Sequence, residues 1–347
     1  MSKEGDVYNV AVAANERFMP GALMALSSLA VNARQESRLC FHVFTEDVLS
    51  ATMDEMKAVL RRVHPNCEVL QYVCDEQLLA GLPYWAGSRM ASVRIHFPYL
   101  LKDVDWCLYL DCDIAYLASV EEHFSLRDES KYAVVVPDES DEFCFPEVRR
   151  IHERCGVDVP REKYFNSGVM LFNFAKCRQD GIPDRLLEFF KTNADSKLPD
   201  QTAYNVVFNG LTVIAPGKFN RLLPHLTVEK LRERPVLHYI SGKPWTKTYG
   251  EVANSRFRFW HAYADKYLWQ KKGESCRRCF SWRMLIVKKV LFEVLRMPIV
   301  GGAFAKLMGI VGLVKGDGCS WRKMQIIPEL ETREAKVAMA ALIAGTQ

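Results

Sequence analysis

Two hydrophobic patterns alternate along the first part of the chain. Short apolar runs at residues 7–13, 41–44 and 69–73 are typical of buried strands. After the first run, apolar residues recur at the spacing of one helical face: Leu23, Leu26, Leu29, Ala30 and Ala33. After the second, Ser50 is expected to cap a helix with one buried face: Met53, Met56, Leu60 and Val63. This alternation predicts an α/β fold whose mostly parallel sheet is covered on both faces.

Later apolar runs continue the same pattern. Strands are predicted at residues 107–110, 132–136, 169–172 and 236–238. Helices are predicted at 183–191, which has proline at its first position, and at 200–208. Because open α/β sheets bind ligands at the carboxyl ends of their strands, polar residues at these ends are the candidates for function.

Composition and charge divide the chain into two parts. Its 347 residues are 49% hydrophobic and 25% charged, which indicates a globular protein. The net charge of +4 is too balanced to predict nucleic-acid binding. Residues 271–315 nevertheless hold ten Lys or Arg against two Glu, so the rest of the chain is mildly acidic. We therefore predict a main domain at residues 1–270 and a basic, helical C-terminal appendage at 271–347.

The cysteines and the N-terminal residues indicate the cellular compartment in which the protein is expected. The eleven cysteines are odd in number and several lie in apolar runs, where reduced thiols are expected. The N-terminal residues lack the apolar core of a signal peptide, and no Asn-x-Ser/Thr sequon occurs. The predicted location is the cytoplasm. Cys276 and Cys279 lack the second ligand pair of a zinc site.

An acidic pair, Asp111 and Asp113, follows the predicted strand at 107–110. Two carboxylates at this spacing can reach one Mg²⁺ or Mn²⁺, which would bridge phosphate oxygens, although the spacing also suits an ordinary turn. A phosphatase of the haloacid dehalogenase type would need Thr or Val where Ala115 stands. A nucleotidyltransferase or a dehydrogenase would need a glycine-rich loop at residues 13–17, which contain no glycine.

The chain also carries seven motifs that occur together, in this order, in one enzyme family. They are Val10-Ala11-Val12-Ala13-Ala14-Asn15, Ala91-Ser92-Val93-Arg94, Tyr109-Leu110-Asp111-Cys112-Asp113, Asp138, Tyr164-Phe165-Asn166-Ser167-Gly168-Val169, Asp200-Gln201, and Leu237-His238-Tyr239 followed by Gly242-Lys243-Pro244-Trp245. Together they resemble the retaining glycosyltransferases of family 8, which include lipopolysaccharide galactosyl- and glucosyltransferases and glycogenin. The resemblance covers residues 6–250 and implies a GT-A-type fold, a single Rossmann-like domain with a mostly parallel mixed sheet.

The resemblance also implies a set of site residues. The metal ligands would be Asp111, Asp113 and His238. The UDP-sugar would contact Ala13, Asn15, Arg17, Arg94, Asp111, Cys112, Gly242 and Lys243. The residues around the transferred sugar would be Asp138, Asn166, Asp200 and Gln201. Mn²⁺ is favoured over Mg²⁺ because it accepts imidazole more readily. With Lys243, the metal would stabilise the departing diphosphate.

Several alternatives stay open at this stage. A covalent double displacement would need a carboxylate, for which Asp200 is the candidate. The resemblance instead favours a front-face reaction, in which the departing phosphate deprotonates the acceptor and Gln201 stabilises the cation-like sugar. Structural roles are also open: Asn166 could cap a turn, Arg94 could form a surface ion pair, and Asp200 could be a helix N-cap.

Partners are predicted from the resemblance and from the C-terminal segment. The expected donors are UDP-glucose and UDP-galactose, and the expected acceptor is a glycan or a lipid-linked sugar such as lipopolysaccharide. Residues 271–315 interleave cations with apolar clusters, as in helices that lie on anionic membranes, which would attach the protein to the inner face of the cell membrane. The alternatives are a solvated basic helix that packs on the main domain and, for function, an inactive transferase-fold scaffold that binds polyanions.

Overall fold

The computed structural model describes residues 7–84, 88–140, 145–196, 198–240, 242–246, 255–269 and 332–344. The chain divides into two compact units. The first is Met1–His225 with Glu233–His238, and the second is Leu226–Arg232 with Tyr239–Gln347. The predicted basic segment 271–315, including Cys276 and Cys279, lies outside the described residues, so the boundary after residue 270 stays a prediction.

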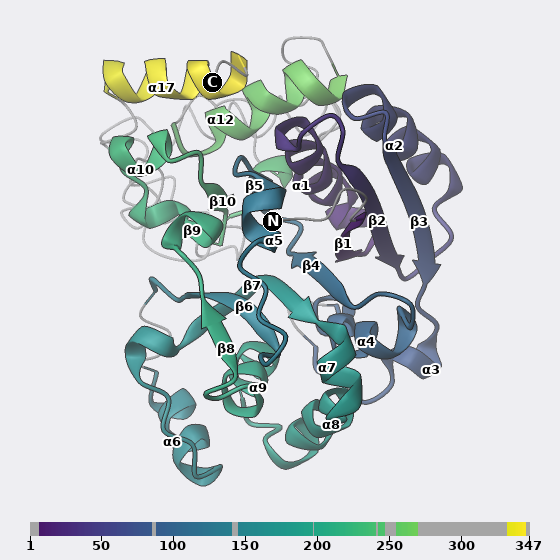
Figure 1. The fold of residues 1–347 in the computed structure, drawn as a ribbon, viewed down its shortest axis with the longest axis vertical. Coiled ribbons are helices and arrows are strands. Elements are labelled where there is room, and N and C mark those ends of the chain that lie inside the picture. The colour runs from purple at the N-terminus through teal and green to yellow at the C-terminus, as the bar shows by residue number, and fades with distance from the viewer. Residues whose placement is uncertain are drawn as a thin grey trace, which may run out of the picture. The chain divides into compact units, whose positions relative to one another are not determined.

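A seven-stranded sheet forms the centre of the first unit (Figure 1). Its strands, in spatial order, are β3 (Cys67–Val73), β2 (Arg38–Thr45), β1 (Val7–Ala14), β4 (Trp106–Leu110), β7 (Phe165–Asn173), β6 (Ala133–Pro137) and β8 (Thr212–Ile214). All neighbours pair in parallel except β7, which is antiparallel to both β4 and β6. The predicted α/β fold with a mostly parallel mixed sheet is therefore confirmed.

The direction of β7 corrects one expectation about the site. We expected functional residues at the carboxyl end of every strand, including the run at 169–172. Because β7 is antiparallel, its beginning, not its end, lies beside the carboxyl ends of β4 and β6: Leu110 pairs with Val169 and Pro137 with Phe165. Residues 166–168 are thereby brought to the functional edge of the sheet.

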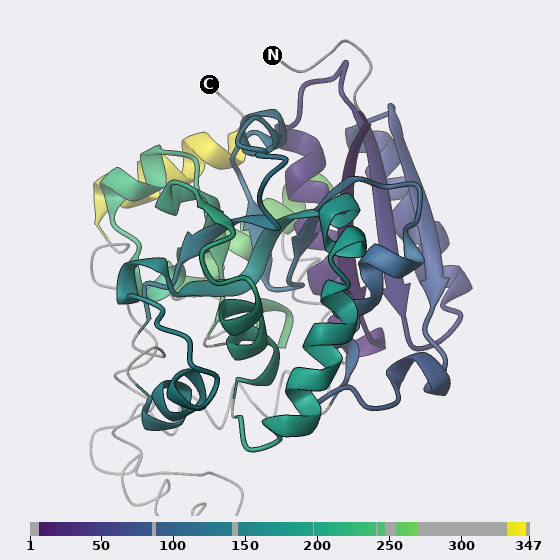
Figure 2. The ribbon, with the colours of Figure 1, turned by 60° about the horizontal axis from the view of Figure 1, so that its bottom comes forward.

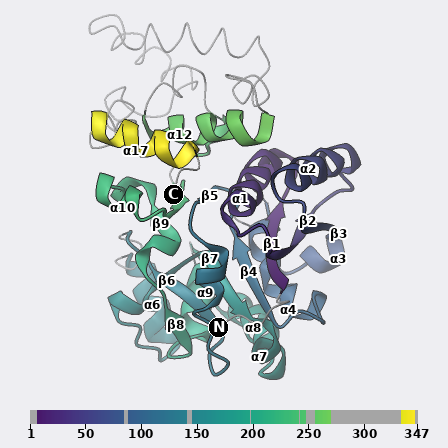
Figure 3. The ribbon, with the colours of Figure 1, turned by 45° about the horizontal axis from the view of Figure 1, so that its top comes forward.

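Helices cover both faces of this sheet. Figure 2 and Figure 3 show α1 (Met19–Asn32) and α2 (Ser50–Val63) on one face, and α7 (Phe174–Gln179) and α8 (Ile182–Thr192) on the other. The other helices in the described part of the unit are α3 (Glu76–Leu79), α4 (Phe97–Leu100), α5 (Val120–Phe124), α6 (Pro146–Arg154), α9 (Pro199–Val207) and the 3-10 turns η1 (Glu16–Phe18), η2 (Met90–His96), η4 (Arg161–Lys163), η5 (Gly217–Asn220) and η6 (Leu223–His225).

The predicted helices at 183–191 and 200–208 are confirmed as α8 and α9, with ends about one residue from those predicted, which is the usual uncertainty of a helix end. Because α8 begins at Ile182, Pro183 is its second residue and not its first. The expected cap is wrong: α2 already includes Ser50, its N-cap position is Leu49, and no side chain caps it.

A second, three-stranded sheet was not predicted as a sheet. Its order is β5 (Ile114–Tyr116), β10 (Val236–His238) and β9 (Arg221–Leu222). In the antiparallel pairing of β10 with β5, His238 lies opposite Ile114, the residue that follows Asp113. This short sheet therefore joins two segments that lie far apart in the sequence.

The second unit is helical where it is described. It contains α10 (Val228–Arg232), η7 (Pro244–Thr246), α12 (Ser255–Ala264), the π-helix η8 (Asp265–Trp269) and α17 (Arg333–Ala344). An ion pair of Arg232 with Glu334 joins α10 to α17, and the Tyr267 hydroxyl donates to the Ile343 carbonyl oxygen at 2.8 Å. Among the described residues, no helix has the length and apolar character needed to cross a bilayer. The seven cysteines of the described part are free thiols.

Candidate metal and donor site

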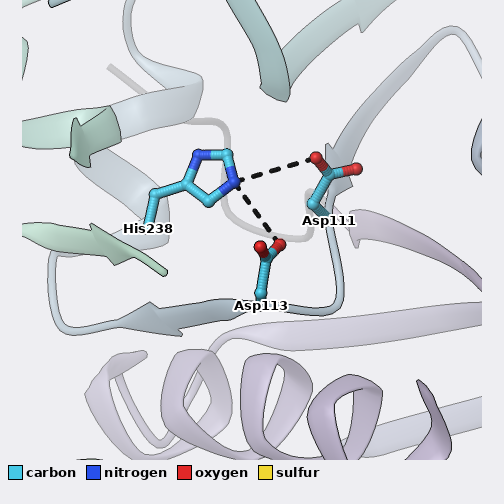
Figure 4. A group of neighbouring side chains, drawn as sticks. All are labelled: Asp111, Asp113 and His238. Carbon is cyan, nitrogen blue, oxygen red and sulfur yellow. Dashed lines mark ion pairs between the residues drawn. The ribbon is translucent and has the colours of Figure 1, made fainter. Parts of the chain in front are cut away.

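Three side chains meet at the junction of the two sheets (Figure 4). Asp111 follows β4, Asp113 precedes β5, and His238 ends β10. The His238 Nε2 atom lies 3.4 Å from an Asp113 carboxylate oxygen and 3.8 Å from Asp111 Oδ2. Their ligand atoms all lie within 4.8 Å of one another. Ligands of one octahedral cation with bonds of about 2.1 Å lie roughly 3 Å apart, so a small contraction would let the three share an ion.

A glycine makes room for this group. The backbone N–H of Asp111 donates to the Gly168 carbonyl oxygen at 2.7 Å, which brings β7 against the acidic pair. A Cβ atom at position 168 would lie 2.7 Å from Asp111 Oδ2 and would overlap the His238 ring. Two carboxylates and one imidazole, held in a space that only glycine leaves open, fit a divalent cation such as Mn²⁺ or Mg²⁺.

Two hydrogen bonds hold one carboxylate oxygen of Asp111. Its Oδ1 atom accepts hydrogen bonds from the Tyr109 hydroxyl at 2.6 Å and from Arg94 at 3.2 Å. Its Oδ2 atom is the one that faces His238. The two donors therefore fix the carboxylate so that the other oxygen points toward the candidate metal position.

Arg94, from η2, links the acidic pair to α9. Its side chain is 3% exposed, it donates to the Ser167 carbonyl oxygen at 2.6 Å, and it forms an ion pair with Asp200. Burial lowers the pKa of Arg94, but Tyr109, Asp200 and Asp111 outweigh burial and raise it, so the guanidinium stays charged. The alternative that Arg94 forms a surface ion pair is wrong, because the residue is buried. Its predicted contact with the donor stays a prediction.

The four residues predicted around the sugar lie together at this edge. Gln201 donates to Asp138 Oδ2 at 3.1 Å and accepts from Asn166 Nδ2 at 3.1 Å. Asp200 is not a helix N-cap, because Leu198 holds that position. Its carboxylate accepts from the Gln201 backbone N–H at 2.8 Å through Oδ1 and pairs with Arg94 through Oδ2. Asn166 does accept the turn-like hydrogen bond from the Gly168 N–H at 3.0 Å, but it also reaches Gln201.

The predicted nucleotide-binding residues of the first unit follow β1. The Cys112 thiol donates to the Ala13 carbonyl oxygen at 3.3 Å, so the end of β1 lies beside the acidic pair. Asn15 precedes η1, the turn that contains Arg17. The Asn15 Oδ1 atom is buried and has no hydrogen-bond partner among the described residues. A buried hydrogen-bond acceptor normally has a partner, so this atom suits a position where an N–H or O–H group of a bound nucleotide would donate to it.

Gly242 and Lys243 belong to the second unit. The Lys243 carbonyl oxygen accepts from the Thr246 N–H at 3.0 Å, so this residue begins the turn at η7. The predicted role of both residues in gripping the diphosphate stays a prediction.

One buried residue of the site was missed. Asn220, at the end of η5, contacts both His238 and Asn166. It ends a short 3-10 turn with no motif around it, and only the fold brings it to the site.

Comparison with known proteins gives the family and the fold of the chain. The family model for glycosyl transferase family 8 matches residues 9–249. A lipopolysaccharide 1,2-glucosyltransferase of Escherichia coli is 30% identical over 225 residues, which cover 62% of this chain and 63% of that protein. A lipopolysaccharide 1,3-galactosyltransferase of Salmonella typhimurium is 25% identical over 196 residues, which cover 54% of this chain and 55% of that protein. The matched part thus spans less than two thirds of each of these relatives.

Solved structures share the fold. The galactosyltransferase LgtC, crystallised with donor and acceptor sugar analogs, superposes with a TM-score of 0.57 at 22% identity, covering 68% of this chain and 89% of that one. The bifunctional glycosyltransferase WbbM gives a TM-score of 0.59 at 15% identity, covering 71% of this chain and 48% of that one. The GT-A-type fold is therefore confirmed. Since the family model matches well over half of the sequence, the chain belongs to glycosyl transferase family 8.

Proposed function

We propose that the protein is a retaining glycosyltransferase that moves a hexose, glucose or galactose, from a UDP-sugar to a glycan or lipopolysaccharide acceptor. The observation that carries this proposal is the group of Asp111, Asp113 and His238 at the edge of a GT-A-type sheet. Membership of family 8 and similarity to a lipopolysaccharide glucosyltransferase and a galactosyltransferase support the reaction class and the type of acceptor.

The chemistry of the leaving group explains the acidic pair. When the bond between sugar and diphosphate breaks, negative charge grows on the phosphate oxygens, and a divalent metal bound at the site would stabilise that charge. Asp111, Asp113 and His238 would hold the metal, with Mn²⁺ preferred because imidazole is one of the ligands. Tyr109 and Arg94 keep Asp111 oriented for this role. Lys243 would add a positive charge at the diphosphate.

The amide and carboxylate groups beside the metal site suit the sugar. Asp138 and Asn166 can bind sugar hydroxyls, and Gln201 lies between them. Both oxygens of Asp200 already have protein partners, one of them the buried Arg94. A paired carboxylate is a poor nucleophile, which supports the front-face reaction over a covalent double displacement. In that reaction the departing phosphate oxygen takes the proton of the acceptor hydroxyl.

We also propose that residues 271–315 attach the protein to an anionic membrane surface on the cytoplasmic side, where a lipid-linked acceptor would be presented. The support is the local charge excess of this segment and its interleaved apolar clusters.

Release of UDP tests the proposed activity directly. The full chain is incubated with Mn²⁺, a lipopolysaccharide acceptor and either UDP-glucose or UDP-galactose, and UDP is measured with and without EDTA. We expect release from one donor above the other, suppressed by EDTA, and NMR of the product should show the anomeric configuration of the donor. No release from any donor in a wider panel of UDP-sugars would favour the alternative, an inactive scaffold of the same fold.

A further inference from the structure

Asn220 lies between the candidate metal site and the candidate sugar site, and the function proposed above does not use it. The residue is 1% exposed. Its Oδ1 atom is 3.0 Å from His238 Nδ1, and its Nδ2 atom is 2.9 Å from Asn166 Oδ1. A buried asparagine with a partner at each end of its amide is fixed in orientation by those partners.

Two backbone N–H groups determine which end of each side-chain amide is the oxygen and which is the NH₂ group. A side-chain amide keeps its shape when its oxygen and nitrogen are exchanged, but a backbone N–H can only donate. The Gly168 N–H lies 3.0 Å from Asn166 Oδ1, so the atom at that position must be the oxygen. The Ser167 N–H lies 3.2 Å from Gln201 Oε1, which fixes that amide in the same sense. Asn166 therefore donates to Gln201, in agreement with both.

The same hydrogen-bond pattern determines which nitrogen of the His238 ring carries a proton. Because Asn166 Oδ1 is an acceptor, Asn220 must present its NH₂ group to it and its oxygen to His238. An oxygen can only accept, so His238 carries a proton on Nδ1. In the neutral ring the lone pair is then on Nε2, the atom that faces Asp111 and Asp113. This is the form in which a histidine binds a metal ion.

We propose that Asn220 is a positioning residue that holds His238 in its metal-binding tautomer and orientation, with its own polarity set by the start of β7. Without Asn220, the ring could place its proton on Nε2, where the lone pair is needed. The row of amides continues through Asn166 to Gln201, whose NH₂ group reaches Asp138 Oδ2 at 3.1 Å. The inference rests on the proposed function to the extent that a metal is held by His238.

Two substitutions at position 220 separate the roles of its two ends. Asn220→Leu keeps the branched shape of the side chain and removes both hydrogen bonds. Asn220→Asp can still accept from His238 Nδ1 but has no donor for Asn166. Mn²⁺ binding is measured for the full chain by the EPR signal of free Mn²⁺, without any UDP-sugar. We expect Asn220→Leu to weaken Mn²⁺ binding roughly 10- to 100-fold. Asn220→Asp should bind Mn²⁺ nearly as the unchanged protein does, yet release UDP more slowly because its link to Asn166 is lost.

A matched control accounts for the general cost of losing a buried asparagine. Asn193 is 3% exposed and donates to the Phe189 carbonyl oxygen at the end of α8, away from His238. Asn193→Leu should leave Mn²⁺ affinity unchanged. Unchanged affinity in Asn220→Leu, or an equal loss in both leucine variants, would overturn the proposal.

A second measurement does not depend on how well a variant folds. In the unchanged protein with ¹⁵N-labelled histidine, NMR should show a proton on Nδ1 of the metal-free His238 ring, and a ring protonated on Nε2 alone would refute the inference. Asp113→Asn separates the two proposals. If this variant loses Mn²⁺ binding while Asn220→Leu does not, only the role of Asn220 fails. If it binds Mn²⁺ unchanged, the proposed metal site fails and the inference fails with it.

Discussion

Replacement of Gly168 by alanine should damage the candidate metal site without unfolding the protein. Gly168 lies within β7, and its φ angle is not in the left-handed region, so alanine suits the backbone. The added Cβ atom would lie 2.7 Å from Asp111 Oδ2 and 3.1 Å from Asn166 Oδ1, and it would overlap the His238 ring. The strand cannot easily retreat, because the Gly168 carbonyl oxygen accepts from the Asp111 N–H at 2.7 Å.

The size of the effect follows from these distances. Non-bonded carbon atoms are most stable at about 3.5–4.0 Å, so the carboxylate and the ring must each move by roughly 0.5–1 Å. A displacement of about 1 Å in a catalytic site typically costs about 100-fold in rate. We therefore expect Gly168→Ala to reduce Mn²⁺-dependent UDP release about 100-fold and to weaken Mn²⁺ binding at least about 10-fold.

The assay compares UDP release, Mn²⁺ affinity and Tm in Gly168→Ala and in a control, Gly210→Ala. Gly210 has φ of +75° and no atom within 4 Å of a built Cβ, so its substitution strains the backbone without touching the site. We expect the control to lose about 1 kcal/mol of stability while keeping its activity and Mn²⁺ affinity. Activity of Gly168→Ala within about threefold of the unchanged protein, at unchanged Mn²⁺ affinity, would show that the geometry around Gly168 does not limit the reaction.

Three further predictions concern the metal, acid stability and the basic segment. Asp113→Asn should lower UDP release by about 100-fold or more while Tm stays close to that of the unchanged protein; a smaller loss would remove this residue from the ligands. Burial lowers the pKa of His123 to about 3 in the folded protein, whereas the unfolded value is about 6.5. As the pH falls, the unfolded state therefore binds a proton before the folded state does. Between about pH 7.5 and pH 5 this difference should lower the stability of the protein by about 2 kcal/mol. In urea titrations at these two values, His123→Phe should therefore lose about 2 kcal/mol less than the unchanged protein, and an equal loss would contradict the assignment. Replacement of Lys288 and Lys289 by glutamate should weaken sedimentation of the protein with anionic vesicles and leave UDP release unchanged. Replacement of the exposed Arg61 and Arg62 of α2 by glutamate should change neither property. Equal vesicle binding by the two variants would rule out attachment through the basic segment.

Six of the seven strands of the main sheet could be predicted because they repeat a strong local pattern, whereas β8, which is three residues long, was not predicted. Buried parallel strands are nearly continuous apolar runs, and each of the predicted runs overlaps a strand. The strands β5 and β9 have three and two residues, too few to show any periodicity. The direction of a strand could not be predicted from its own residues either, because the same apolar run can pair in parallel or antiparallel.

The candidate site was found to the extent that its residues stand in motifs. Asp111, Asp113 and His238 were named from the sequence, and the fold brings them together. Apart from the hydrogen bond from Tyr109 to Asp111, which joins neighbours in the sequence, the contacts that orient them were not accessible, because a hydrogen bond between segments far apart in sequence leaves no local trace. Asn220 is the clearest case. Arg94 is another case. Its motif indicated a contact with the UDP-sugar, whereas the fold places its guanidinium between the carboxylates of Asp111 and Asp200.

The start of β7 explains why the candidate metal and sugar sites lie side by side. Parallel strands bring only their carboxyl ends to the functional edge, but the antiparallel β7 brings its first residues between the ends of β4 and β6. Three consecutive residues then serve both sites. Gly168 leaves the space for Asp111 and His238, the Ser167 N–H and carbonyl oxygen hold Gln201 and Arg94, and Asn166 reaches Gln201. A substitution that shifts this short segment should therefore disturb metal binding and sugar transfer together, whereas changes at either neighbouring strand end should affect one of them more than the other.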